Sequence, residues 1–409
     1  MKKEIPESVS LGPVSTGGQL PQWFDGRLVI LDRKLAPLGE TRWWRLKLAI
    51  FCTLCSIFYA TPFFTLLSPP ETPLLWKVIH QQAAHPLTPV SGLEPSSHEA
   101  KHVFRLTMPL LAKLSPVASE RVQMPFLFAA QYAAGVLFFV LCYTLFQQLL
   151  HNHATATLLT LSTAFIYPGQ ACFFDLNGYF DGMAMLFLLL TFVCRSHLLV
   201  FVCLLAAFWV DERAIVAASY TYLWLKLKNG TDVGWRQLLL PDYRSMVVPL
   251  AIVITLGLRF WLTRQYGFAL PVSEEGYVGF ARFFRIERMF RLPIGIFSPL
   301  KLHWLLIALA GVCLWLNRRF TLLVLGCLAV LASVGVALAV VDLTRSLNYV
   351  FPAVILSVAL VAKASNQRFM LALSAILLVL AVILPSFFVM TDAGWIFPLP
   401  VKILFSRFL

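Results

Sequence analysis

The sequence predicts an all-α polytopic membrane protein with about eleven transmembrane helices. Apolar residues make up 59% of the chain and charged residues 13%, whereas soluble domains average roughly 25% charged residues. Apolar runs that approach or reach the length of a bilayer crossing recur along the whole sequence. The short polar loops at alternate ends of these runs are basic and lack carboxylates, as expected of cytoplasmic loops.

The amino-terminal segment, residues 1–44, is polar, contains Pro, Gly and Ser, and shows no sustained apolar periodicity. It is predicted to be a partly ordered cytoplasmic arm. Trp43 and Trp44 stand between basic residues, a pattern typical of an anchor at the membrane interface. The first apolar run starts only near Leu46, which argues against a cleavable signal peptide. Residues 45–409 are predicted to form the transmembrane domain.

The spans follow from the apolar runs in chain order, each closed by polar or charged residues. Several are somewhat shorter than the usual crossing length. The predicted spans are 46–67, 124–150, 154–170, 183–194, 198–210, 214–225, 246–262, 302–316, 320–341, 347–362 and 369–390. Two long loops, 68–121 and 263–300, fall on the outer face if the amino terminus is cytoplasmic.

The charge of the chain is interpreted as a membrane property. The formal net charge is +13, and basic inner loops together with anionic lipid headgroups account for such a charge. No basic module or RNA-binding motif accompanies it, so no nucleic-acid partner is expected. The Met-Lys-Lys start and the minimal loops favour a bacterial inner membrane, with an active site on the periplasmic side.

The first outer loop, 68–121, concentrates titratable residues in an otherwise apolar chain. It holds four histidines, and Glu94 and Glu99 are its central acids. His98-Glu99-Ala100-Lys101-His102 matches His-Glu-x-x-His, which on a helix presents two imidazoles to Zn²⁺ and leaves the Glu as a base. Such short motifs often match by chance. The loop therefore allows two interpretations, a loop that activates an acceptor or a zinc site built on His98 and His102.

The remaining acids gather at the predicted outer ends of the spans. Ionisable groups at that depth are costly and usually face a bundle interior or a wet pocket. A shared cavity at the outer membrane surface is therefore predicted. Its candidate residues are Glu94, Glu99, Asp175, Asp181, Asp211, Glu212, Arg213, Glu274, Glu275, Asp342 and Arg345.

The second outer loop, 263–300, has the composition of a helix lying in the membrane interface. Residues 277–293 combine phenylalanines with four arginines, Arg282, Arg285, Arg288 and Arg291. Two interpretations remain open, a membrane anchor or a wall of the site that meets a phosphorylated lipid.

Taken together, residues 46–390 resemble the GT-C superfamily of integral membrane glycosyltransferases. The stretch from Phe104 to Ala112, which contains Arg105 and Pro109, looks like the Arg-x-x-x-Pro-Leu-Leu segment before the second span of that family. Asp181 resembles the acid of its second outer loop, and Asp211-Glu212-Arg213 resembles the polar break before its sixth span. The first-loop acid of the family is usually Asp, whereas this loop offers Glu94 and Glu99.

The resemblance implies transfer of a sugar from a polyprenyl-phosphate donor to a glycan, lipid or protein acceptor on the outer face. A carboxylate would take the acceptor proton, and cations would hold the departing phosphate. Glu99 is the expected base, with Glu94 in reserve. No cofactor is required, although a divalent metal would be compatible. The further expected roles are Asp181 and Asp175 in positioning, Arg213, Arg345, Arg105 and Lys101 in phosphate binding, and Asp211, Glu212, Asp342 and His102 in support.

Two other classes of protein compete with this interpretation. The His-Glu-x-x-His string would suit a membrane zinc metalloprotease. A lipid or glycan transporter would also place charges within the membrane, but the sequence shows no internal repeat and no paired broken helices in matching halves.

Overall fold

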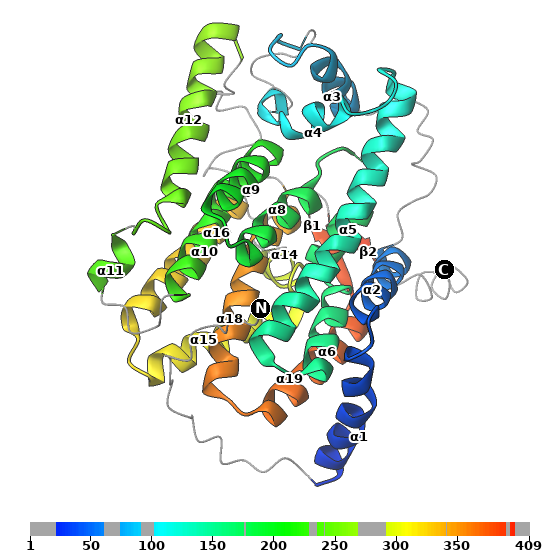
Figure 1. Cartoon of the computed structure of the whole chain (residues 1–409), viewed down its shortest axis with the longest axis vertical. Coiled ribbons are helices and arrows are strands. Elements are labelled where there is room, and N and C mark those ends of the chain that lie inside the picture. Colours follow the sequence, from blue (N-terminus) through cyan, green and yellow to red (C-terminus); the bar gives the residue numbers. More distant parts are fainter. Residues whose placement is uncertain are drawn as a thin grey trace.

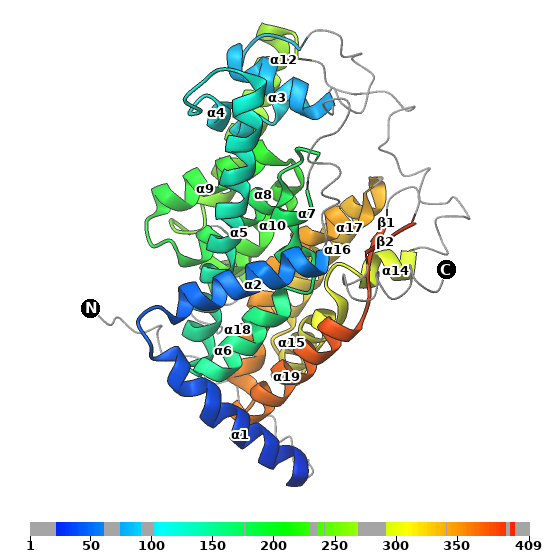
Figure 2. The same ribbon diagram turned by 90° about the vertical axis from the view of Figure 1, so that its right-hand side faces the viewer.

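The computed structural model describes residues 22–60, 74–90, 102–175, 177–228, 235–240, 242–268, 292–340, 342–389 and 393–396. These residues form a bundle of helices with one small hairpin of strands (Figures 1 and 2). By length and composition, four described helical stretches could cross a membrane: Glu120–Leu150, Val247–Tyr266, Phe320–Ala339 and Leu343–Ala364. Four others are apolar but shorter: Asp181–Val193, His197–Val210, Lys301–Leu316 and Gln367–Ile383. The helical class is as predicted, and the number of crossings stays a prediction.

The helices follow the predicted apolar runs closely in the first half of the chain. The long helix α5 runs along much of the molecule, with α3 and α4 beside its amino-terminal end (Figure 1). The first elements are α1 (Gln22–Gly39), α2 (Trp44–Ala60), α3 (Leu74–Ala84), α4 (Thr107–Ala112), α5 (Glu120–Leu150), α6 (His153–Thr163), α7 (Tyr167–Phe174), α8 (Asp181–Val193), α9 (His197–Val210) and α10 (Arg213–Leu227).

The second half contains the most buried and the least buried of the four stretches that could cross a membrane. Of the apolar window in Leu343–Ala364, 89% lies inside the protein, against 22% for Phe320–Ala339, so the former is central and the latter peripheral. The elements are α11 (Trp235–Leu239), α12 (Val247–Tyr266), α14 (Leu292–Phe297), η4 (Lys301–His303), α15 (Trp304–Leu316), α16 (Phe320–Ala339), α17 (Leu343–Leu347), η5 (Asn348–Val350), α18 (Phe351–Ala364), α19 (Gln367–Ile383), β1 (Ser386–Val389) and β2 (Ala393–Ile396).

The amino-terminal arm, predicted to be partly ordered, contains the regular helix α1 over residues 22–39, which the sequence did not predict. Leu28, Leu31 and Leu35 recur at helical spacing and supply a short apolar stripe. This stripe packs against Ala154 of α6 and Leu371 of α19. The stripe is too short to stand out in a polar segment, and the helix is stabilised by its docking on the bundle.

The predicted third span is two helices, α6 and α7, instead of one. Pro168 lies in the first turn of α7 and has no N–H to continue a helical ladder. The chain folds back so closely that a Cβ on Gly169 would lie 2.0 Å from the carbonyl oxygen of Thr163. Glycine is therefore required at this bend.

The predicted eleventh span, 369–390, is also too long. Helix α19 ends at Ile383, and Leu384 takes an extended conformation at ψ 131°. Pro385 explains this end, since the residue before a proline is driven out of the helical region. The chain then forms β1, which pairs antiparallel with β2 so that Phe387 lies opposite Trp395.

Candidate functional site

Charged side chains from four separate segments meet where α8, α10 and α17 begin. Asp181 is the first residue of α8, Arg213 is the first residue of α10, and Arg345 lies in α17. Arg105 reaches the same place from the turn before α4. We call the group the acid–arginine cluster: Asp181, Asp211, Glu212, Asp342, Arg105, Arg213 and Arg345.

Asp181 is the centre of the cluster. Its carboxylate accepts from Arg213 Nη2 at 2.8 Å and from Arg345 Nε at 2.6 Å. The side chain is completely buried, with 0% exposure. A carboxylate buried this deeply is tolerated only when it is paired and hydrogen-bonded. Asp181 therefore joins α8 to both α10 and α17.

Packing between α7 and α8 sets the position of Asp181. Gly182 follows it, and a Cβ at this glycine would lie 2.3 Å from Cys172 Sγ and 2.7 Å from the backbone nitrogen of Cys172. The absence of a side chain thus lets the start of α8 approach α7. Phe180, just before Asp181, adopts a left-handed conformation at φ 59°, which is uncommon for a residue with a bulky side chain.

All three guanidinium nitrogens of Arg213 donate hydrogen bonds within the protein. Its Nε donates to Asp211 Oδ1 at 2.8 Å, and its Nη1 donates to Ser346 Oγ at 2.9 Å. Its Nη2 is shared between Asp181 and Asp211. The guanidinium also lies over the ring of Tyr349, at 5.2 Å from the centroid. Each nitrogen of the Arg213 guanidinium therefore has an acceptor among the described residues.

Arg345 is likewise occupied. Besides Asp181, it donates from Nη1 to Asp342 Oδ2 at 2.6 Å. Its guanidinium carbon lies 3.4 Å from the ring centroid of Tyr179. A stacked guanidinium that is also paired in two directions is held in one orientation. We conclude that Arg213 and Arg345 link the helices in this structure.

Arg105 differs from the other two arginines. Its Nη2 is 3.2 Å from Asp211 Oδ2 and 3.3 Å from Glu212 Oε1. Its Nε and Nη1 are buried and have no hydrogen-bond partner among the described residues. A buried guanidinium with unused donors is rare, because leaving such donors unsatisfied is costly. Arg105 therefore retains donor capacity that a ligand oxygen or water would satisfy.

More polar atoms without a described partner lie on both sides of Arg345 in the chain. Asn348 is fully buried, and neither its amide oxygen nor its amide nitrogen has a partner in the described part of the chain. The same holds for the hydroxyl of Tyr349 and for Asp342 Oδ1. Sequence reasoning missed Asn348 and Tyr349. Their spacing of three and four residues from Arg345 on a helix was the available signal.

The carboxylate of Asp175 forms hydrogen bonds within the turn that precedes α8. It accepts from the backbone nitrogen of Asn177 at 3.0 Å and from that of Phe180. Burial, together with the nearby charge of Asp181, raises the pKa of Asp175 above its ordinary value.

The pKa of Asp211 is shifted in the opposite direction. Burial disfavours its charge, but Arg105 and Arg213 outweigh burial and hold the pKa of Asp211 well below its ordinary value.

The cavity beside the cluster is small. It measures about 10 Å³ and lies between His102, Arg105 and Tyr179, which is about the room of one water molecule. The predicted shared cavity includes residues outside the described ranges and stays a prediction, whereas its described residues form a network of paired charges. Four acids and three arginines come close to neutralising one another, and pairing is the cheapest state for charges in a dry interior.

The rest of the predicted site lies outside the described residues. This applies to Glu94, His98, Glu99 and Lys101 of the first loop, and to the acids and arginines between 269 and 291. His102 is described, is buried, and has its ring 6.0 Å from that of Tyr179. Within the described part of the chain, no three His, Cys, Asp or Glu side chains are grouped to hold a metal ion. The zinc alternative depends on residues outside it.

Comparison with known proteins adds one similar structure. No protein-family model and no curated protein sequence matches the chain. The chain is similar to the crystal structure of the Archaeoglobus fulgidus oligosaccharyltransferase, tethered by a disulfide bond to an acceptor peptide containing the NVT sequon. The match covers 84% of this chain and 54% of that chain, at 12% identity and a TM-score of 0.44. The chain thus spans about half the length of that enzyme, and the likeness is too weak to establish a shared fold or activity.

Proposed function

We propose that this protein is an integral membrane glycosyltransferase of the GT-C type. It would move a hexose or pentose from a polyprenyl-phosphate donor to an acceptor on the outer face of a bacterial inner membrane. One observation carries the proposal: the acid–arginine cluster, in which buried Arg105 keeps two unused donors beside Asp211 and Glu212. Guanidinium groups with free donors are well suited to phosphate oxygens.

Within the cluster we assign different roles to Arg105 and to the other two arginines. Arg105 is the residue we assign to the donor phosphate, together with Lys101 from the first loop. Arg213 and Arg345, which the sequence assigned to the phosphate, are assigned instead to holding Asp181 and Asp342. Each of their guanidinium nitrogens already donates to a described residue. Asn348 and the hydroxyl of Tyr349 have unused polar atoms suited to sugar hydroxyls.

The proposed reaction is a single inverting displacement. The acceptor oxygen forms a bond to the anomeric carbon of the sugar while the bond from that carbon to the phosphate oxygen breaks. The phosphate leaves with the electron pair, and Arg105 stabilises its charge. Glu99 accepts the proton of the acceptor hydroxyl, with Glu94 as the alternative base. Glu99 stands three residues before His102 in the sequence, and His102 lines the small cavity beside Arg105.

Donor turnover in proteoliposomes tests the proposal. Purified full-length protein is reconstituted with polyprenyl-phosphate-linked glucose, mannose, galactose or arabinose and a membrane extract as the acceptor source, and release of polyprenyl phosphate is followed. Glu99→Gln and Arg105→Gln should each lower the rate about 10²- to 10³-fold, the loss typical of a group that acts on the transition state. Arg264→Gln, at an exposed arginine of α12, is the matched control and should stay at the wild-type rate.

Three results would change the assignment. Full activity of Glu99→Gln would remove Glu99 as the base, and Glu94→Gln would then be tested in its place. Folded protein that turns over no donor of the panel would reject the glycosyltransferase. Stoichiometric zinc in the purified protein that is lost in His102→Ala would favour the metalloprotease instead.

A further inference from the structure

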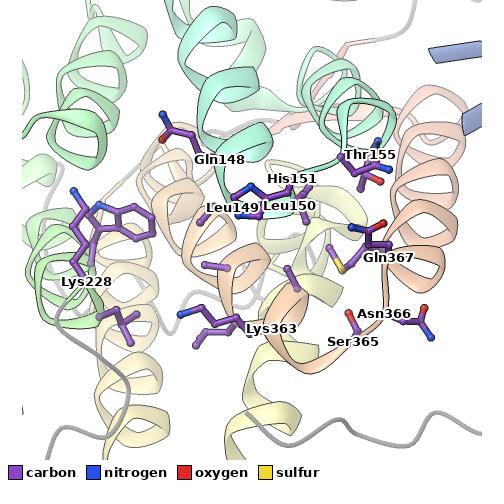
Figure 3. Close-up of a pocket in the computed structure, with 17 residues that line it drawn as sticks. Gln148, Leu149, Leu150, His151, Thr155, Lys228, Lys363, Ser365, Asn366 and Gln367 are labelled. Atoms are coloured by element: carbon purple, nitrogen blue, oxygen red, sulfur yellow. Dashed lines mark hydrogen bonds between the residues drawn. The ribbon is translucent and has the colours of Figure 1, made fainter. Parts of the chain in front are cut away.

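A second polar region lies at the opposite ends of the helices that begin at the acid–arginine cluster. Here a cavity of about 410 Å³ opens between the last turns of α5, α10 and α18 and the first turns of α6 and α19. We call it the basic cavity. Figure 3 shows its polar side chains, among them Lys228, Lys363, His151, Thr155 and Gln367. None of these residues was assigned a role by the sequence.

The basic cavity has cations without matching acids. No Asp or Glu lines it, and neither Lys228 nor Lys363 forms an ion pair with a described carboxylate. The Lys228 ammonium donates to the carbonyl oxygen of Phe192 at 3.1 Å and lies 5.4 Å from the ring of Trp224. The neighbouring acid is Asp32 of α1, which accepts from Asn152 Nδ2 at 3.3 Å on the α6 side. Uncompensated ammonium groups attract an anion to the cavity.

Two helix starts add to this attraction. Helices α6 and α19 both begin at the wall of the cavity, where backbone N–H groups carry partial positive charge. Thr155, in the first turn of α6, is 1% exposed, and its hydroxyl has no hydrogen-bond partner among the described residues. Thr155 is one of the residues that line the cavity, and its hydroxyl has a hydrogen to donate.

The cavity also has an apolar part. Leu149, Leu227, Leu360 and Met370 belong to it, and they come from four different helices. Two of the helices that end or begin here, α5 and α18, belong to stretches apolar and long enough to cross a membrane. A small free anion would satisfy the polar groups alone, whereas a lipid would use both parts of the lining. The combination therefore favours an amphipathic ligand.

We propose that the basic cavity binds the phosphate headgroup of an anionic lipid, with Lys228 and Lys363 at the phosphate and the acyl chains over the apolar lining. The interaction would attach this end of the bundle to the anionic leaflet. The proposal is independent of the glycosyltransferase assignment, because no residue of the acid–arginine cluster takes part in it.

Native mass spectrometry of the full-length protein in detergent tests the proposal. The protein is titrated with phosphatidylglycerol, with phosphatidylcholine or with inorganic phosphate, and the bound species are counted. We expect one retained phosphatidylglycerol per chain. Lys228→Gln/Lys363→Gln should weaken this binding by about 10- to 30-fold, as the loss of two cations near a lipid surface predicts. The control is Lys34→Gln/Lys47→Gln, which removes the same charge from exposed lysines outside the cavity and should leave binding unchanged.

Because Lys228 holds the Phe192 carbonyl, the double variant risks disturbing the fold. Lys363→Gln alone avoids this risk, since the Lys363 side chain is exposed and makes no described hydrogen bond. A weaker affinity for phosphatidylglycerol in this single variant supports the proposal. Equal retention of phosphatidylcholine, unchanged binding in both variants, or displacement of the lipid by millimolar inorganic phosphate would overturn it.

Discussion

The two ends of the central helices differ in whether their charged side chains are paired with side chains of opposite charge. Helix α10 begins at Arg213, which is engaged by Asp181 and Asp211, and ends beside Lys228, which has no described acidic partner. The central stretch Leu343–Ala364 likewise runs from the paired Arg345 to the unpaired Lys363. The 15 residues of α10 separate the two ends by about 22 Å at 1.5 Å per residue.

Burial explains the difference. The arginines of the cluster are 8% exposed or less, so each must have a carboxylate close by to offset the loss of hydration. The lysines of the basic cavity are partly or largely exposed and can stay charged in contact with solvent. Arg213 and Arg345 are therefore committed to structure, and Arg105 is the buried arginine of the cluster that keeps donor nitrogens unused by the described residues. An exposed charge remains available to a partner.

The first and largest predicted effect concerns the centre of the cluster. Asp181→Asn leaves Arg213 and Arg345 without the carboxylate they share, and we expect a loss of about 3–5 kcal/mol in unfolding free energy. Thermal unfolding in detergent measures it. Glu40→Gln is the control: its side chain is exposed and forms no described ion pair, so it should cost less than about 1 kcal/mol. Equal losses would show that the cluster does not bind the helices together.

The second prediction tests the packing that places Asp181. Gly182→Ala brings a methyl group against Cys172, and overpacking of this kind costs about 1–3 kcal/mol. Gly257→Ala is the control, because nothing lies within 4 Å of its added Cβ, and there alanine should be neutral or stabilising by up to about 1 kcal/mol. Similar melting temperatures for the two variants would contradict the close contact of α7 and α8.

A smaller effect is expected from the pH dependence of Asp175. Burial raises its pKa above the ordinary 3.8, so as the pH falls from 7 the folded state takes up this proton before the unfolded chain does. The folded state therefore gains stability until the pH nears the unfolded value. The melting temperature of the wild type minus that of Asp175→Asn should thus rise between pH 7 and pH 4. A constant difference would rule out a perturbed Asp175.

The smallest effect on stability is expected at the other end. Lys363→Gln removes an exposed charge with no described partner, so unfolding free energy should change by no more than about 0.5 kcal/mol. Its affinity for phosphatidylglycerol should nevertheless fall. A large loss of stability here would remove the contrast between the two ends of the bundle.

Much of the helix pattern was predictable, because long apolar runs in a membrane protein have few alternatives to a helix. Helices α8, α9 and α10 each begin within one or two residues of the predicted runs. Short stripes and prolines were harder to interpret. The three leucines of α1 are recognised as a packing stripe only from their contacts with α6 and α19. Pro168 and Pro385 end or interrupt helices through the local backbone, which apolar periodicity does not report.

The sequence by itself determined the helical class and the residues that gather near Asp181, because acids and arginines stand out at the ends of apolar runs. Tertiary structure alone decided how these charges pair, and it separated the occupied Arg213 and Arg345 from Arg105 with its unused donors. It also created the basic cavity, whose lining comes from helices far apart in the chain. Ion-pair partners and cavities depend on distances between segments that are far apart in the chain, and local sequence patterns do not specify those distances.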